Sequence, residues 1–187
     1  MLNKVRGAPA IAIVAALAVA VELVQAPAAG TLPATAADVA RLIRQRWAHL
    51  KTSRPTAVNL FDAAARLGAL VDKAAAAPAA SSADVVAAYV AAAERMLEDD
   101  VRDNRAIGRF GATRVLSAAA GLASGRSMDG AVVLTHCNTG SLATAGYGTA
   151  LGIVRALHEQ GRLAHVYCTE TRPYNQVRAR FARPAWP

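Results

Sequence analysis

The residues whose types and spacing could do chemistry gather in one stretch, from Gly130 to Gly152. An apolar run, Ala131 to Leu134, predicts a strand buried on both faces. Polar residues follow it, with a thiol at Cys137, and small residues then lead into a helix expected from about Tyr147 to Gln160. In open α/β sheets, ligands bind at the carboxyl ends of the strands. The thiol therefore stands where a reacting group is expected.

This thiol has two interpretations from the residues alone. A cysteine at a strand end, near a helix N-terminus and arginines, is in a setting that favours the thiolate. A lone cysteine on a buried strand is more commonly an inert packing residue. Cys168 ends the second predicted strand, Leu163–Cys168, and we interpret it as packing. His136 is expected to orient the loop around Cys137.

Two arginines stand beside predicted helix starts and could bind an anion. The segment Arg6-Gly7-Ala8-Pro9 leads into an apolar run that extends to Val21. Such a start places backbone amides and a guanidinium beside an anion. Arg54 precedes Pro55, where a helix restarts. It is either a solvated loop arginine, which is the commoner case, or a phosphate clamp.

Composition limits the classes of partner. The chain has 187 residues and a net charge of +8, which favours an anionic partner. No stretch interleaves aromatic and basic residues as a nucleic-acid reader does, so no nucleic acid is expected. The two cysteines are expected to be free thiols in a reducing compartment. The acidic run that begins at Glu98 is interpreted as a solvated or ion-paired helix face, and we predict neither a metal nor a cofactor.

The chain divides into a helical first part and an α/β second part. Residues 1–127 predict a helical domain, and residues 128–187 the start of a Rossmann-like parallel α/β domain. Strand, crossover helix and strand predict one right-handed parallel unit. Two strands do not make a covered parallel sheet, so the predicted fold class is α/β with an incomplete, truncated second domain. The helices of the first part are expected from Asp38 to Leu50, from Pro55 to about Val71, from Asp84 to Asn104 and from Ile107 to Ala120.

The N-terminal segment is ambiguous. A basic start, an apolar run and small residues around Ala26 are typical of an export signal, and the run is short for a transmembrane helix. Pro9 at its start and Glu22 at its end are instead typical of a buried helix. The residues favour neither interpretation. An exported helical protein would have a mature N-terminus after Ala26.

Five segments of the chain begin at Arg6, Arg54, Glu98, Thr135 and Glu170. They occur in the order found in the methylthioribose-1-phosphate isomerases, which are related to the alpha, beta and delta subunits of translation initiation factor 2B. The chain resembles this family from about Lys4 to Gln176, and His136 to Gly140 is the most specific segment. The translation-factor subunits are similar in fold but differ where Cys137 stands.

The resemblance implies an aldose–ketose isomerase that converts 5-methylthioribose 1-phosphate to 5-methylthioribulose 1-phosphate in methionine salvage. It assigns Cys137 as the proton acceptor. It implies a cytoplasmic, possibly also nuclear, enzyme that needs no cofactor, has no membrane partner and forms a homodimer in the family. It also makes the first apolar segment a buried helix rather than an export signal. Substrate contacts are implied for Arg6, Gly7, Ala8, Arg54 and Gln176.

The departures from the family pattern matter as much. The family's proton-donor aspartate has no counterpart here, and the residues from about Val177 onward depart from the family's sequence. We therefore expect this polypeptide alone to be inactive and its homodimer to be doubtful. The alternative function is that of a non-catalytic interaction subunit of the same fold, like the translation-factor relatives.

Overall fold

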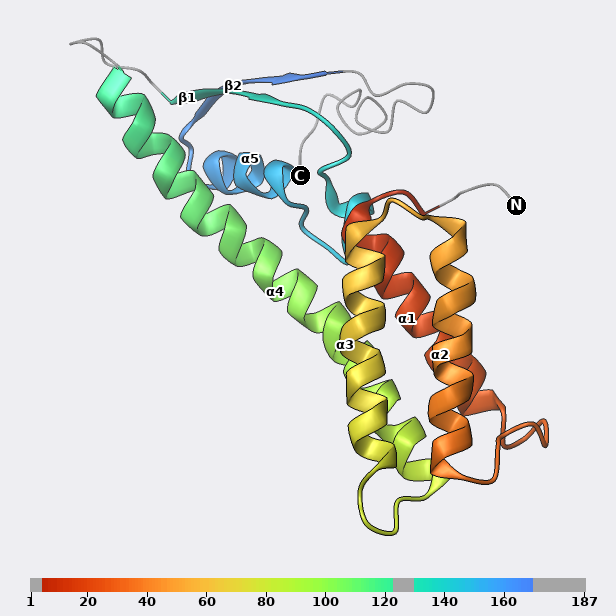
Figure 1. Ribbon diagram of the computed structural model, residues 1–187. Coiled ribbons are helices and arrows are strands. Elements are labelled where there is room, and N and C mark those ends of the chain that lie inside the picture. The colour runs from red at the N-terminus through yellow and green to blue at the C-terminus, as the bar shows by residue number, and fades with distance from the viewer. Residues whose placement is uncertain (1–4, 123–129, 170–187) are drawn as a thin grey trace. The chain divides into compact units, whose positions relative to one another are not determined.

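The computed structural model describes residues 5–122 and 130–169 (Figure 1). Contacts between Cα atoms divide the chain into two compact units, Met1–Asp99 and Asp100–Pro187. The domain boundary predicted after residue 127 falls outside the described residues and stays a prediction. The elements in chain order are α1 (Ala8–Gln25), α2 (Ala36–Ser53), α3 (Val58–Ala75), α4 (Ser82–Leu122), β1 (Ala131–Thr135), the 3-10 helix η1 (Ser141–Ala143), α5 (Ala150–Glu159) and β2 (Leu163–Cys168).

The first unit is built on an apolar core shared by four helices. α1 is long and apolar enough to cross a membrane by length and composition, and 44% of that span is buried inside the protein. Its buried side chains pack with those of α2, α3 and the beginning of α4 in one cluster. Pro9 lies in its first turn, where a missing amide hydrogen leaves no intrahelical bond unmade. Large buried side chains of this core include Trp47, Tyr89, Leu23, Ile43 and Leu60.

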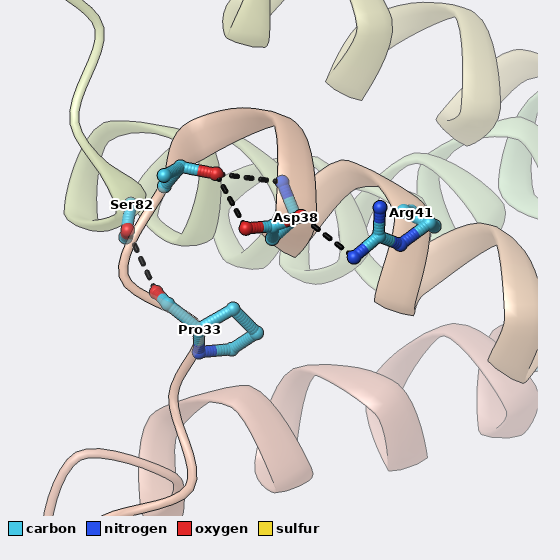
Figure 2. A network of polar contacts seen from close by, with 5 residues as sticks. Pro33, Asp38, Arg41 and Ser82 are labelled. Atoms are coloured by element: carbon cyan, nitrogen blue, oxygen red, sulfur yellow. Dashed lines mark hydrogen bonds and ion pairs between the residues drawn. The ribbon is translucent and has the colours of Figure 1, made fainter.

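Side-chain hydrogen bonds lie at the beginnings of α2 and α4. Figure 2 shows the start of α2, where the amide of Asp38 donates to the Thr35 hydroxyl at 3.2 Å and Arg41 pairs with the Asp38 carboxylate at 2.7 Å. A neighbouring bond joins Ser82, the first residue of α4, to the carbonyl of Pro33 at 2.8 Å. The Thr35 cap satisfies one amide that α2 itself leaves unbonded, and Ser81 does the same for α4 by accepting the Asp84 amide at 3.2 Å. The Ser82 bond is different, because it joins the start of α4 to the segment before α2 across 49 positions of sequence.

One polar chain crosses this apolar core. The indole Nε1 of Trp47 donates to the Tyr89 hydroxyl at 3.1 Å, and that hydroxyl donates to the carbonyl of Ala16 at 3.3 Å. Tyr89 is fully buried, and this burial raises the pKa of its hydroxyl. The bonds therefore join α1, α2 and α4 through groups that have no access to water.

We expect Tyr89→Phe to destabilise the first unit, because it leaves the Trp47 N–H and the Ala16 carbonyl buried without their partner. A buried group left unsatisfied costs about 1–3 kcal/mol. Urea unfolding followed by the fluorescence of buried Trp47 measures the change. Tyr167→Phe is the matched control, because Tyr167 is 56% exposed. Equal stability of the two variants would contradict a structural role for the buried hydroxyl.

α4 is one helix of 41 residues, so the prediction of two helices, Asp84 to Asn104 and Ile107 to Ala120, was wrong. Gly108 and Gly111 lie within it and do not break the helix. In the structure they are contact points instead: a Cβ at Gly108 would lie 2.7 Å from a ring carbon of Tyr147, and one at Gly111 would lie 2.5 Å from the Ile153 side chain. The helix therefore tolerates the low helix propensity of glycine where a neighbouring segment packs directly on its backbone.

The second unit contains the predicted parallel strand pair with its connecting helix. β1 and β2 pair in parallel, with Thr135 opposite Cys168, and α5 packs against both strands (Figure 1). Gly161 ends the connection with φ +64, as expected of a helix-ending glycine. Ala112 of α4 joins Ala131, Ala156 and Leu157 in the core of this unit.

The strands are covered on one face only within the described residues, so the prediction that β1 is buried on both faces was wrong. Burial alternates along β1: Val132 is 51% exposed and Leu134 is 74% exposed. A strand buried on both faces and a strand with one apolar exposed face give the same run of apolar residues, because each presents alternate side chains to opposite faces.

Candidate functional site

The first group of predicted binding residues meets at one end of the first unit. The beginning of α1, the end of α2 and the beginning of α3 lie at this end (Figure 1). Gly7 is the residue before α1, and Arg54 is the residue after α2. The Arg54 Nη2 donates to the carbonyl of Val5 at 3.2 Å, across 49 positions of sequence. The structure thus brings Arg54 to the segment that contains Arg6, Gly7 and Ala8.

The chemistry of this end suits an anion. The N-terminus of α1 carries no acidic residue in its first turn, and the same holds for α3. Helix N-termini present unbonded amides and the positive end of the helix dipole. Gly7 is buried and has no side chain, whereas Arg6 and Arg54 are half-buried. We call Arg6, Gly7, Ala8 and Arg54 the arginine cluster.

Cys137 lies in the second unit, two residues after β1. Its thiol is free and exposed, and its backbone has φ +81. Residues other than glycine avoid this left-handed region, so the surrounding contacts must hold the turn against local strain. His136 Nδ1 contacts the Thr169 hydroxyl, and the Thr169 amide donates to the Thr135 carbonyl at 3.1 Å. Side chain and backbone together tie the turn to the end of β2.

The turn is also fixed from the side of α5. The amide of Thr149, the residue before α5, donates to the carbonyl of Thr139 at 2.9 Å. Gly148 has φ +88, and a Cβ there would lie 2.7 Å from that same carbonyl oxygen. Only glycine fits this close backbone approach without displacement. Backbone contacts two residues after Cys137 therefore join the turn to the start of α5.

Cys168 differs from Cys137 in its environment. It lies at the end of β2, is half-buried, and has a raised pKa because burial disfavours the thiolate. A protonated, shielded thiol is a poor nucleophile. This environment suits the packing role that the sequence suggested. Gln176, the remaining predicted substrate contact, lies outside the described residues.

Asp100 takes part in the second unit in a way that the sequence analysis missed. Its carboxylate accepts a hydrogen bond from the Ala145 amide at 2.7 Å. The side chain of Asn104, which is 3% exposed, donates to the backbone carbonyl of Asp100 at 2.7 Å. Burial is the largest cause that raises the pKa of Asp100, although the Ala145 and Asn104 hydrogen bonds lower it. The sequence pattern predicts a solvated or ion-paired helix face for this acidic run. The contact of Asp100 with Ala145, 45 positions away, has no local signal in the sequence.

The comparisons with known proteins agree with the resemblance seen in the sequence. The Initiation factor 2 subunit family matches residues 4–183. The chain belongs to that family. A methylthioribose-1-phosphate isomerase of Paracoccidioides brasiliensis (strain Pb18) is 54% identical over 173 residues, which cover 92% of this chain and 45% of the relative. One from Pyrenophora tritici-repentis is also 54% identical, over 92% of this chain and 42% of its own length. The chain thus spans slightly under half the length of these relatives.

Two solved structures of the family show the same fold. The 5-methylthioribose 1-phosphate isomerase from Pyrococcus horikoshii superimposes with a TM-score of 0.71 at 32% identity, covering 92% of this chain and 42% of the other. The delta subunit of translation initiation factor eIF-2B from A. fulgidus gives a TM-score of 0.65 at 35% identity, covering 92% and 44%. The predicted fold, a helical first part followed by a short parallel sheet, is confirmed by both family members.

We expect iodoacetamide to alkylate Cys137 before Cys168 in the folded chain. Cys137 is exposed, whereas Cys168 is half-buried and its raised pKa lowers its thiolate fraction. Peptide mass spectrometry over a time course separates the two rates. Cys137→Ser should remove the fast reaction, and Cys168→Ser, the matched control, should leave it. Equal rates in the folded protein would contradict the environments described for the two thiols.

We expect the free energy of unfolding of Asp100→Asn to increase relative to that of the parent chain as pH rises. A raised folded-state pKa favours the protonated carboxyl, so its stabilising contribution is present below the unfolded value near 3.8 and is lost as pH rises through the folded pKa. Asparagine keeps an oxygen that can accept the Ala145 amide. Urea unfolding followed by circular dichroism, at about pH 4 and about pH 7, measures the difference. A variant that loses stability relative to the parent between these two pH values would contradict the sign.

Proposed function

We propose that the chain carries the proton-accepting part of an aldose–ketose isomerase acting on methylthioribose 1-phosphate. The relatives that are 54% identical over 92% of this chain have the name of that enzyme. The observation that carries the proposal is the exposed Cys137 thiol, held in a left-handed turn at the carboxyl end of a parallel strand. That place in an α/β sheet is where ligands bind, and backbone strain held by surrounding contacts is typical of functional sites.

The reaction explains why a thiol is useful. Moving a carbonyl from C1 to C2 of a sugar requires a base close to C2 and a route for a proton or hydride to C1. The anomeric oxygen carries the phosphate, so ring opening also needs help. The Cys137 sulfur is proposed to accept the proton. The resemblance implies that an aspartate outside the matched segment is the proton donor.

The arginine cluster is proposed to bind the phosphate. Arg6 and Arg54 supply guanidinium groups, and the start of α1 supplies backbone amides. Charge-assisted bonds of this kind are stronger than neutral ones and suit phosphate oxygens. Gln176 is proposed as a further substrate contact on the resemblance alone.

We expect Arg54→Ala to weaken binding of methylthioribulose 1-phosphate by about tenfold or more, because a charge-assisted hydrogen bond contributes about 1.5–3 kcal/mol. Isothermal titration calorimetry measures the dissociation constant. Arg41→Ala is the matched control: it removes the same charge from a 67% exposed side chain on α2. Arg54→Lys, which keeps the charge, covers the case in which alanine disturbs the Val5 contact. Binding unchanged in both Arg54 variants would contradict the phosphate role.

We expect these 187 residues alone to form no ketose from methylthioribose 1-phosphate, because they span slightly under half the length of the isomerase relatives. A coupled assay or product NMR checks this expectation. Turnover at a relative's rate would contradict it. In that event Cys137→Ser must abolish the turnover, or the proposed role of the thiol also falls.

A non-catalytic role is the second candidate. The likeness to the eIF-2B delta subunit from A. fulgidus favours it, because that protein shares the fold. An interaction subunit would need neither an exposed Cys137 nor a phosphate-binding arginine cluster. Sugar-phosphate binding that depends on Arg54 therefore supports the isomerase, and its absence supports the interaction subunit.

A cytoplasmic location follows from the same proposal. The apolar residues of α1 contribute to the core of the first unit, which accounts for their hydropathy without a membrane. The resemblance implies a homodimer, and we propose this oligomeric state together with the isomerase function. Neither a membrane nor a nucleic acid is proposed as a partner.

A further inference from the structure

The segment between η1 and α5 rests directly on α4. The Ala145 amide donates to the Asp100 carboxylate at 2.7 Å. Two residues later, the Tyr147 ring lies against Gly108, where a Cβ would come within 2.7 Å of the ring. Gly152 of α5 packs on the same ring, with 3.0 Å from its ideal Cβ position to the nearest ring carbon. A phenol ring is thus enclosed between backbone atoms of α4 and α5.

Tyr147 is held in a conformation that it would not adopt alone. Its φ is +69, which costs a non-glycine residue local strain. The guanidinium groups of Arg105 and Arg155 lie 5.2 Å and 5.8 Å from the ring centroid. The phenol hydroxyl donates to the Glu159 carboxylate at 3.1 Å. Cation–π attraction and ring packing offset the strain and fix the ring from both helices.

The two residues after Tyr147 connect its fixed ring to the turn that contains Cys137. Gly148 approaches the backbone of Thr139 and Gly140, and the Thr149 amide donates to the Thr139 carbonyl at 2.9 Å. Because Gly148 leaves no room for displacement, a shift of Tyr147 would move Thr139. Thr139 is two residues from Cys137, whose left-handed backbone needs outside support.

We propose that Tyr147 and Asp100 are positioning residues for Cys137. They pack the segment 144–149 against α4. The backbone contacts of Gly148 and Thr149 with Thr139 then fix the backbone of the Cys137 turn. The positioning role rests on the proposed function, because it matters only if Cys137 is the reacting group. The contacts of Asp100 and Tyr147 can themselves be tested without substrate.

Amide hydrogen exchange of the 187-residue chain tests the link. We expect Tyr147→Ala to speed exchange of the Thr149 amide about tenfold or more, because local opening exposes it. Tyr147→Phe keeps the ring and should remain close to the parent. Asp100→Ala should speed exchange of the Ala145 amide, whereas Asp100→Asn keeps an acceptor and should restore it. The ratio of Cys137 to Cys168 alkylation rates should change in the two alanine variants and not in the conservative ones.

A second pair of variants keeps the proposal testable if Tyr147→Ala fails to fold. Gly108→Ala places a methyl group against the ring, and Gly121→Ala makes the same change on α4 where no atom lies within 4 Å. We expect faster Thr149 exchange and an altered alkylation ratio in the first and neither in the second. Unchanged exchange in both Tyr147→Ala and Gly108→Ala would overturn the proposal. Faster exchange in these variants, together with no sugar-phosphate binding by the parent chain, would instead count against the proposed function alone.

Discussion

The contact on which the second unit depends is the close approach of Gly148 to the backbone of Thr139 and Gly140. It leaves no space for a side chain, since an ideal Cβ at Gly148 would lie within 3 Å of three backbone atoms. It also aligns the Thr149 amide with the Thr139 carbonyl just before α5 begins. The turn that carries Cys137 is therefore attached to the start of the following helix by backbone, which is stiffer than a side-chain contact.

Two residues of this unit have a strained backbone that neighbouring contacts stabilise. Cys137 and Tyr147 both have positive φ, and each lies beside an interaction that offsets the strain. For Cys137 the support comes from the contact between His136 and Thr169 and from the strand pair. For Tyr147 it comes from two guanidinium groups and the backbone of two helices. An exposed thiol held in a fixed backbone fits a proton-transfer role, because such a role needs defined geometry before substrate arrives.

The repeating patterns of the sequence predicted most of the fold. Helical spacing in α2 and α3, the two apolar strands and the glycine after α5 depend on neighbours in sequence, so a single chain reveals them. The exposed face of β1 did not follow, because an apolar run does not say how many faces are covered. The continuity of α4 did not follow either, because the contact of Tyr147 with Gly108 is made by packing and is not visible in the local sequence.

The candidate site was predictable to a similar extent. The thiol and both arginines stood out by their residue types and by the resemblance. Their surroundings did not, because the bond from Arg54 to Val5 spans 49 positions and that from Ala145 to Asp100 spans 45. Such contacts are set by packing, and local patterns carry no information about them. Asp100 in particular could not be distinguished from the other acidic residues of its run by sequence.

A matched pair of glycine substitutions tests the central contact most directly. Gly148 and Gly161 both have positive φ, so alanine strains the backbone at either position, but only at Gly148 does it also collide with backbone atoms. The measurement is the exchange rate of the Thr149 amide in Gly148→Ala and in Gly161→Ala. We expect the first variant to exchange at least about tenfold faster than the second, because the hydrogen bond to Thr139 opens. Equal protection of that amide in both variants would contradict the account.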